Sequence, residues 1–326
     1  MRRLLVPLAV ICALTAGCGE KEESIEPGAP EPLELMLDFF PNADHAPIYA
    51  AEAGGHFEDV GLDVEIRQPP DPAAPLKQVV AGRVDLAISY EPEVLRARDQ
   101  GLAAHAVGAL VQVPLTSIIS LPPAGIRRPE DLDGKVVGTA GIDYQSAYLS
   151  AIAREAGAKV EEQGVGFNLS GALLAKKVDA VLGAFWNYEG TDLKLRGRDP
   201  QILRIEQAGV PTYDELVLVA NADQDDDRIK RFIAALERGV ADLRRDPDRA
   251  LKGLLEANPD LDPKLQREVL DVTLPLFEPP RGKPYGWQDP GEWNEFARWM
   301  RDNELLENLI DAEGSFTNEY LPGEVP

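Results

Sequence analysis

Cysteine is nearly absent from this chain of 326 residues, which contains only Cys12 and Cys18. Because both lie close to the N-terminus, the rest of the sequence can form neither a disulfide nor a cysteine metal site. Histidine is also scarce, and its three residues lack the spacing of metal ligands. The sequence contains no Walker loop and no Gly-x-Ser-x-Gly elbow. We therefore expect no metal, no cofactor and no catalytic apparatus.

Clusters of lysine and arginine are lacking as well. The formal net charge is −23 at neutral pH. Such a chain repels the phosphates of nucleic acids and anionic lipid headgroups, so neither is an expected partner.

The N-terminus combines Arg2 and Arg3 with an apolar run from Leu4 to Leu14, followed by Thr15-Ala16-Gly17-Cys18. This run is shorter than the ~20 residues of a membrane-spanning helix and ends in small residues, which indicates a signal peptide. Ala16-Gly17-Cys18 resembles the cleavage site of bacterial lipoproteins. The resemblance implies a lipoprotein signal over residues 1–18 and acylation of Cys18. The exported protein would be anchored to the outer face of the cell membrane or be periplasmic. Thr15 replaces the usual leucine, so secretion without a lipid is the alternative.

Residues 19–32 are rich in Glu, Pro and Gly and predict a flexible tether. The folded part is expected to begin near Leu33. About 290 residues then remain, more than one domain core usually holds, which favours two lobes.

From Leu33 onward, short apolar runs alternate with segments of helical periodicity, the pattern of an α/β protein. The predicted strands are Leu33–Asp38, Leu62–Arg67, Leu86–Tyr90, Ala104–Leu110, Ser117–Leu121, Val136–Thr139, Ala180–Phe185 and Leu216–Ala220. The predicted helices include Ala46–Ala53, Leu76–Ala81, Tyr144–Ala156, Ser170–Ala175 and the amphipathic stretches Asp226–Leu255 and Pro263–Val272.

An internal similarity supports two lobes of similar plan. Val84-Asp85 and Val178-Asp179 each follow a helix and lead into an apolar strand. The Pro-rich turn after residue 121 predicts entry into a second lobe, and the chain is expected to return near residue 217. Lobe 1 would then comprise residues 33–120 and 217–326, and lobe 2 residues 121–216.

Aromatic residues stand beside carboxylates or amides just after several predicted strands. In open α/β sheets, ligands bind beyond the carboxyl ends of the strands. Stacking rings and accepting carboxylates together suit a flat heteroaromatic ligand that carries amino groups. The alternative is that the rings belong to the core and the carboxylates cap helices. The predicted ligand-binding residues are Asp38, Phe39, Asn42, His45, Tyr90, Glu91, Asn168, Trp186, Asn187 and Glu189.

Three motifs carry a family resemblance: Asp38-Phe39-Phe40-Pro41-Asn42, Gly82-Arg83-Val84-Asp85-Leu86 and Gly183-Ala184-Phe185-Trp186-Asn187. They resemble the ThiY-type solute-binding proteins, which deliver formylaminopyrimidine for thiamine salvage, and the resemblance extends over nearly the whole chain. It implies a type II periplasmic-binding-protein fold, with two α/β lobes joined by a two-strand hinge. The ligand would be formylaminopyrimidine or hydroxymethylpyrimidine, and the monomeric protein would pass it to an ABC permease. Phe39 stands where these proteins usually have tryptophan, so riboflavin or another flat heterocycle is the alternative ligand.

The same superfamily contains the fungal thiamine-pyrimidine synthase, which binds pyridoxal phosphate on a lysine and consumes one of its own histidines. The alignment places that lysine at Ser89 and the donated histidine at Glu93. Since serine cannot form a Schiff base, we expect a binding protein and not an enzyme.

Overall fold

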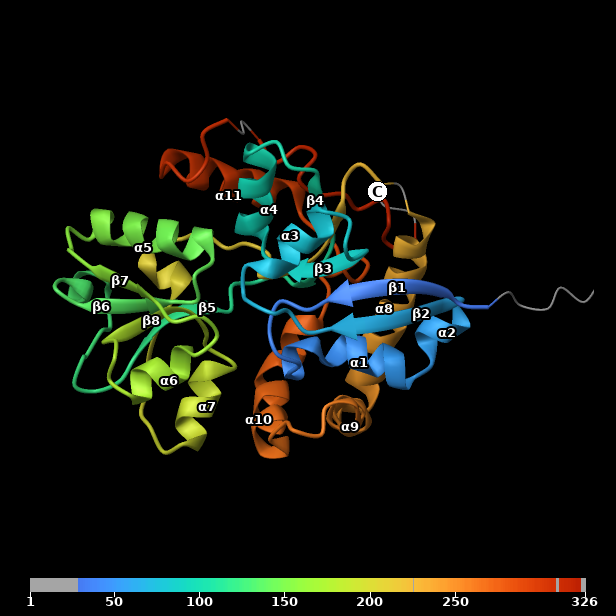
Figure 1. Cartoon of the computed structure of the whole chain (residues 1–326), viewed down its shortest axis with the longest axis horizontal. Coiled ribbons are helices and arrows are strands. Elements are labelled where there is room, and N and C mark those ends of the chain that lie inside the picture. The colour runs from blue at the N-terminus through green and yellow to red at the C-terminus, as the bar shows by residue number, and fades with distance from the viewer. Residues whose placement is uncertain (1–28, 225, 309–310, 324–326) are drawn as a thin grey trace, which may run out of the picture.

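The computed structural model describes residues 29–224, 226–308 and 311–323. Its chain forms two α/β lobes that lie side by side (Figure 1). The signal peptide and Cys18 fall outside the described residues, as does most of the tether. The first strand, β1 (Glu31–Met36), begins two residues earlier than expected, because Glu31 N donates to Gly61 O and the strand pairs with its neighbour from Glu31 onward. Within the described ranges, no helix is both long enough and apolar enough to cross a membrane.

Lobe 1 is built on a sheet with the strand order β2-β1-β3-β10-β4. The strands β2 (Leu62–Arg67) and β3 (Leu86–Ser89) run parallel to β1, whereas β10 (Leu216–Asn221) runs antiparallel to β3 and to β4 (Ala104–Val111). The antiparallel β10 is the strand by which the chain returns from lobe 2. The helices of this lobe are α1 (Ala46–Ala53), α2 (His56–Asp59), α3 (Ala74–Val80), α4 (Glu91–Asp99), α8 (Asp227–Arg245), α9 (Pro247–Ala257), α10 (Pro263–Thr273) and α11 (Pro290–Asp302), with the short turns η1 (Ala43–His45) and η4 (Leu274–Phe277).

Lobe 2 repeats this plan, with the strand order β7-β6-β8-β5-β9. Its strands are β5 (Thr116–Ser120), β6 (Val136–Thr139), β7 (Glu161–Gly164), β8 (Ala180–Phe185) and β9 (Gln201–Arg204). Its helices are α5 (Asp143–Glu155), α6 (Leu169–Leu174) and α7 (Glu189–Leu195), with the turns η2 (Pro129–Leu132) and η3 (Ile205–Ala208). Figure 1 shows α5 on one face of this sheet and α6 and α7 on the other.

The first crossing between the lobes lies earlier than predicted. β5 pairs with β8 and β9, so residues 116–120 belong to the sheet of lobe 2 and not to lobe 1. We define residues 112–115 and 209–215 as the hinge segments, because they connect the strands and turns of the two sheets.

The predicted internal similarity is confirmed by a shared hydrogen-bond motif. The carboxylate of Asp85 accepts from Glu34 N at 2.8 Å, and that of Asp179 accepts from Val136 N at 2.9 Å. Each carboxylate thereby joins the start of a central strand, β3 or β8, to the neighbouring parallel strand. The same hydrogen bond therefore occurs at equivalent positions of the two lobes.

The predicted helical stretch 226–255 is two helices, and Pro247 explains the break. Proline cannot continue a helix from the preceding turn but is well suited to a first helical turn. Pro247 begins α9, and the side chain of Asp246 caps it by accepting from Arg249 N.

Candidate functional site

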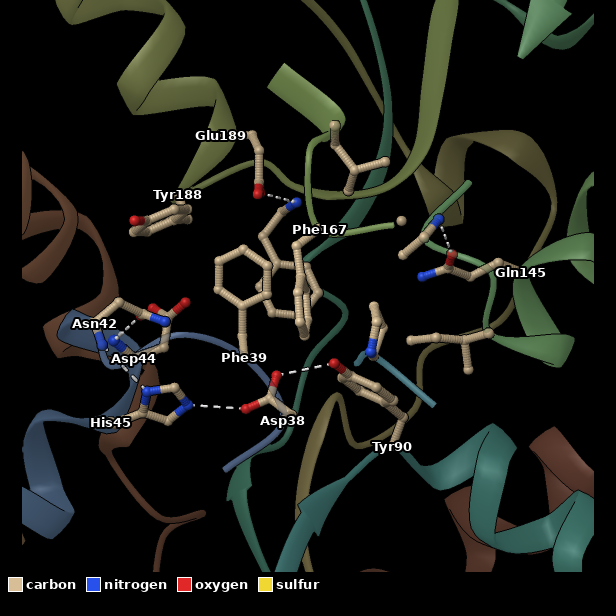
Figure 2. Close-up of a pocket in the computed structure, with 16 residues that line it drawn as sticks. Asp38, Phe39, Asn42, Asp44, His45, Tyr90, Gln145, Phe167, Tyr188 and Glu189 are labelled. Atoms are coloured by element: carbon tan, nitrogen blue, oxygen red, sulfur yellow. Dashed lines mark hydrogen bonds and ion pairs between the residues drawn. The ribbon is translucent and has the colours of Figure 1, made fainter. Parts of the chain in front are cut away.

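A pocket lies between the lobes, at the strand ends and the loops that follow them (Figure 2). Lobe 1 contributes residues that follow β1, β2 and β3, and lobe 2 contributes β8, the start of α7, the loops before α5 and α6 and the first turns of these two helices. The lining residues are Asp38, Phe39, Asn42, Asp44, His45, Pro72, Tyr90, Ala140, Ile142, Gln145, Phe167, Leu169, Gly183, Phe185, Tyr188 and Glu189.

The lobe 1 side of the pocket is organised around Asp38, which is only 3% exposed. Its Oδ1 lies 2.8 Å from Nε2 of His45, and its Oδ2 accepts from the Tyr90 hydroxyl at 2.9 Å. Asn42 N donates to Nδ1 of His45, so the imidazole carries its proton on Nε2 and donates it to Asp38. Burial and the adjacent Asp38 carboxylate raise the pKa of Tyr90, which keeps its hydroxyl protonated as a donor. These contacts hold the carboxylate in place.

Two further carboxyl groups line the pocket. Burial raises the pKa of Glu189 to about 8 and that of Asp44 to about 6. Oε2 of Glu189 accepts from Phe185 N at 2.7 Å, which leaves its other oxygen for a ligand. At neutral pH the Glu189 carboxyl is therefore largely protonated and can ionise when a donor approaches.

Aromatic rings from both lobes meet at the pocket. The ring of Phe39 in lobe 1 lies edge-on to Phe167 and Tyr188 in lobe 2, with centroid distances of 5.0 and 5.9 Å. A second ring contact across the two lobes joins Tyr90 and Phe185, with a centroid distance of 6.4 Å. A wall of flat rings beside buried carboxyl groups favours a flat ligand with hydrogen-bond donors on its edge.

Asn187 joins the lobes directly. It is fully buried after β8, and its Nδ2 donates to Oδ1 of Asp44 at 2.6 Å and to Oγ1 of Thr273 at 2.8 Å. Asp44 and Thr273 belong to η1 and α10 of lobe 1. We refer to Asn187, Asp44 and Thr273 as the interlobe latch.

Six of the predicted ligand-binding residues line the pocket, and four do not. Those in the lining are Asp38, Phe39, Asn42, His45, Tyr90 and Glu189. Of the other four, Asn187 is held in the interlobe latch. Asn168 is exposed and packs over Gly171 in a groove next to the pocket, whose lining it does not join.

Trp186 and Glu91 support the hinge segments. Trp186 Nε1 donates to Pro114 O, its backbone N–H donates to Leu115 O, and the Arg204 guanidinium lies 4.1 Å from its ring centre. Glu91 is buried, and its Oε2 accepts from Asp214 N at 2.7 Å. Both contacts draw the side chains away from the pocket.

The lining also includes residues that are not among the predicted ligand-binding residues, such as Asp44, Gln145, Phe167 and Tyr188. Asp44 and Tyr188 stand next to predicted residues and could have been found as neighbours after a strand. Gln145 in the first turn of α5 and Phe167 in the loop before α6 carry no motif, so only the fold brings them to the pocket.

The positions aligned with the synthase lysine and histidine, Ser89 and Glu93, are not part of the pocket lining. The Ser89 hydroxyl donates to Oε2 of Glu93, and burial raises the pKa of Glu93 to about 7. This pair offers no amine for a Schiff base. Among the described residues, no group of His, Cys, Asp and Glu is arranged to hold a metal ion.

The sequence of this chain is similar to a known protein family and to several characterised proteins. A family model described as NMT1/THI5 like matches residues 42–250. The formylaminopyrimidine-binding protein of Halalkalibacterium halodurans is 33% identical, with 96% of this chain and 98% of that protein covered. The riboflavin-binding protein RibY of Chloroflexus aurantiacus is 28% identical over 89% of this chain and 86% of its own length. The 4-amino-5-hydroxymethyl-2-methylpyrimidine phosphate synthase of Legionella pneumophila is 25% identical over 89% and 92%.

Solved structures confirm the predicted fold. The alkanesulfonate-binding protein SsuA from Xanthomonas axonopodis pv. citri, bound to MOPS, superposes with a TM-score of 0.67 at 18% identity. The superposition covers 88% of this chain and 98% of SsuA. The two-lobe α/β architecture is that of periplasmic binding proteins.

Proposed function

Because the chain belongs to the NMT1/THI5-like family, we propose that it is the solute-binding protein of an ABC importer and captures a thiamine pyrimidine precursor, formylaminopyrimidine or hydroxymethylpyrimidine. The observation that carries this function is the pairing of Glu189 with the rings of Phe39, Phe167 and Tyr188 in one interlobe pocket. The rings would stack on or border the pyrimidine, and the free Glu189 oxygen would accept from its amino group.

Uptake in this scheme requires no change in the ligand. The ligand would bind to one lobe and contact the other when the hinge segments bend, so that its differential affinity favours the closed form. A permease in the membrane would recognise this closed form. We assign lobe 1 to residues 31–111 and 216–323, and lobe 2 to residues 116–208.

Glu189→Gln is expected to weaken binding of formylaminopyrimidine by about 1.5 to 3 kcal/mol, the usual contribution of a hydrogen bond to a charged group. The glutamine carbonyl can still accept from Phe185 N–H, but its amide would oppose the ligand's amino group with another donor. Calorimetric titration measures the change. Asp192→Asn is the matched control, since that carboxylate also lies on α7 but is paired with Arg196. Equal affinity of Glu189→Gln and the parent protein would remove Glu189 from the ligand contacts.

The pH dependence of binding tests the same contact. Glu189 carries a proton below its pKa of about 8, and accepting from an amino group requires the ionised form. Affinity should therefore rise from about pH 6 to pH 8, by at most tenfold per unit, and level off above. Glu189→Gln should lose this rise. A flat profile in the parent protein would mean that the carboxyl stays protonated in the complex.

Two alternatives are separated by the choice of ligands. Titration against riboflavin tests the substitution of Phe39 for the usual tryptophan, which leaves more room beside the ring. Incubation with pyridoxal phosphate tests the synthase reaction, the remote alternative, since Ser89 and Glu93 stand where the alignment places the lysine and histidine of the synthase. A preference for riboflavin would assign the protein to flavin uptake in place of pyrimidine uptake.

We further propose that the protein is exported and anchored through an acylated Cys18. Cys18→Ser is expected to move the protein from the membrane fraction to the soluble fraction of cells that express it. Immunoblotting of the two fractions measures the shift, and mass spectrometry of the N-terminal peptide identifies the lipid. Recovery of both proteins in the soluble fraction would instead favour secretion without a lipid anchor.

A further inference from the structure

Gln145 is a polar side chain with an unused donor that faces the pocket. It lies in the first turn of α5 and is 2% exposed. Its Oε1 accepts from Ala140 N at 2.8 Å, which fixes the orientation of the amide. With the oxygen held in this way, the Nε2 group is turned toward the space between the lobes, as Figure 2 shows.

The neighbouring backbone makes room for this amide. Gly183 in β8 has a φ of +95°, and a Cβ atom at this residue would lie 2.3 Å from Nε2 of Gln145. Any side chain here would be strained and would also displace the amide. In the described part of the chain, Nε2 makes no hydrogen bond of good geometry. The Tyr144 hydroxyl lies close enough for the amide to lower the pKa of that phenol, but this hydroxyl is itself without a partner.

Different sides of the pocket therefore present different hydrogen-bonding groups. Glu189 and Asp38 present acceptor oxygens, whereas Gln145 presents N–H groups at the N-terminus of α5, where the helix dipole favours partial negative charge. Figure 2 shows Gln145 and Glu189 entering from different sides of the ring cluster. A ligand that satisfies both must carry a donor on one edge and an acceptor on another.

We propose that Gln145 is a specificity-determining residue, whose Nε2 donates to a neutral acceptor of the ligand, either a ring nitrogen or a carbonyl oxygen. This inference rests on the proposed function and deepens it. The amino edge of the pyrimidine would face Glu189, and its acceptor edge would face Gln145. Flat compounds with donors on every edge would leave the Gln145 amide buried without a partner and bind weakly.

Gln145→Glu separates recognition from support of the fold. A glutamate can still accept from Ala140 N–H, but it offers the ligand an acceptor in place of a donor. Titration with formylaminopyrimidine at about pH 9 keeps this carboxyl ionised, above the pKa of about 8 that burial gives the Glu189 carboxyl in the same pocket. We expect affinity to fall at least tenfold, while the circular dichroism spectrum of the ligand-free variant matches that of the parent protein and shows that it is folded.

Gln145→Met provides the matched comparison, because it has similar size but can neither accept nor donate. It should lose as much affinity as Gln145→Glu. If only Gln145→Met loses affinity, Gln145 acts by holding the backbone at Ala140 and the inference is overturned. Equal affinity in the parent protein and both variants would overturn it as well. If the parent protein does not bind formylaminopyrimidine, the proposed function itself fails.

An analogue without the formamide group locates the acceptor. If the ratio of parent to Gln145→Glu affinity persists with this analogue, the acceptor is a ring nitrogen. If the ratio falls to one, the acceptor is the formyl oxygen. Both results support donation by Gln145.

Discussion

Glu215→Ala is expected to lower the free energy of unfolding by about 3 to 5 kcal/mol, the cost of leaving several buried donors without their charged partner. Glu215 is fully buried, and its carboxylate joins the two hinge segments. Oε2 accepts from Leu115 N and Thr116 N, both at 2.7 Å, and from the Tyr213 hydroxyl at 3.0 Å. Oε1 accepts from the Thr116 hydroxyl. The alanine variant would leave all of these donors unpaired.

Glu215→Gln is the matched control, because its carbonyl oxygen can replace Oε2 and its amide can donate to the Thr116 hydroxyl. We expect it to lose no more than about 1.5 kcal/mol. Urea unfolding followed by circular dichroism measures both variants. Alanine and glutamine variants of equal stability would show that the four contacts do not stabilise the hinge.

The pH dependence of stability should reflect the same carboxyl group. Burial raises the pKa of Glu215 to about 7, above the value of 4.5 expected in the unfolded chain. Between these values the folded protein binds a proton that the unfolded chain lacks, so the contribution of Glu215 to stability declines as pH rises from 4.5 to about 7 and is constant above. Glu215→Gln removes this contribution to the slope.

The sheets were predictable where the strands carry an apolar run or an alternation of apolar and polar residues. Runs such as Leu62–Arg67, Val136–Thr139 and Ala180–Phe185 appear in the structure with the predicted bounds. The strands β7 and β9 were missed because they lie at the edges of their sheet and lack an apolar pattern. β7 is exposed along its whole length and pairs only with β6, so its hydrogen bonds and not its side chains define it as a strand.

The location of the pocket at the strand ends could be predicted from the sequence, but the full set of side chains that line it could not. The rule that ligands bind beyond strand ends identified Asp38, Tyr90 and Glu189. It failed for Trp186, although strand alternation contains the answer: Gly183 and Phe185 face the pocket, so Trp186 faces away toward the first hinge segment. Residues brought from lobe 2, such as Gln145, depend on how the lobes pack, which local patterns do not encode.

Asn187 lies outside the pocket lining but joins the two lobes that form its walls. The sequence placed it among the ligand contacts because it follows β8. In the structure its amide holds the two lobes together through Asp44 and Thr273. Since the pocket has walls from both lobes, any change that opens this latch also separates the residues that line the pocket.

Asn187→Asp should therefore reduce ligand affinity more than any single change in the pocket. The variant keeps the size of the side chain but places a second carboxyl group at the contact where Asn187 Nδ2 lies 2.6 Å from Asp44 Oδ1. Two buried carboxylates at this distance cannot both be ionised, so closing the lobes must take up a proton. At about pH 7.5 the closed form should be destabilised by about 3 to 5 kcal/mol, which corresponds to an affinity loss of roughly 150- to 5,000-fold.

Lower pH should restore binding in this variant. At low pH one of the two carboxyl groups is already protonated in the open form, so closing the lobes no longer has to take up a proton. Relative to the parent protein at the same pH, affinity is expected to rise by about tenfold for each unit that the pH falls toward 5, on top of the opposite pH dependence that Glu189 gives both proteins. Asn187→Ala removes the donor without adding a charge, so it should lose less affinity and respond less to pH. The titratable groups nearby are Asp44, whose pKa burial raises to about 6, with His45, Asp38 and Glu189. Calorimetric titration of both variants between about pH 5 and pH 8 measures the slopes. If Asn187→Asp and Asn187→Ala lose equal affinity at every pH, the loss comes from the missing hydrogen-bond donor alone. Repulsion between two carboxyl groups in the closed form would then play no part.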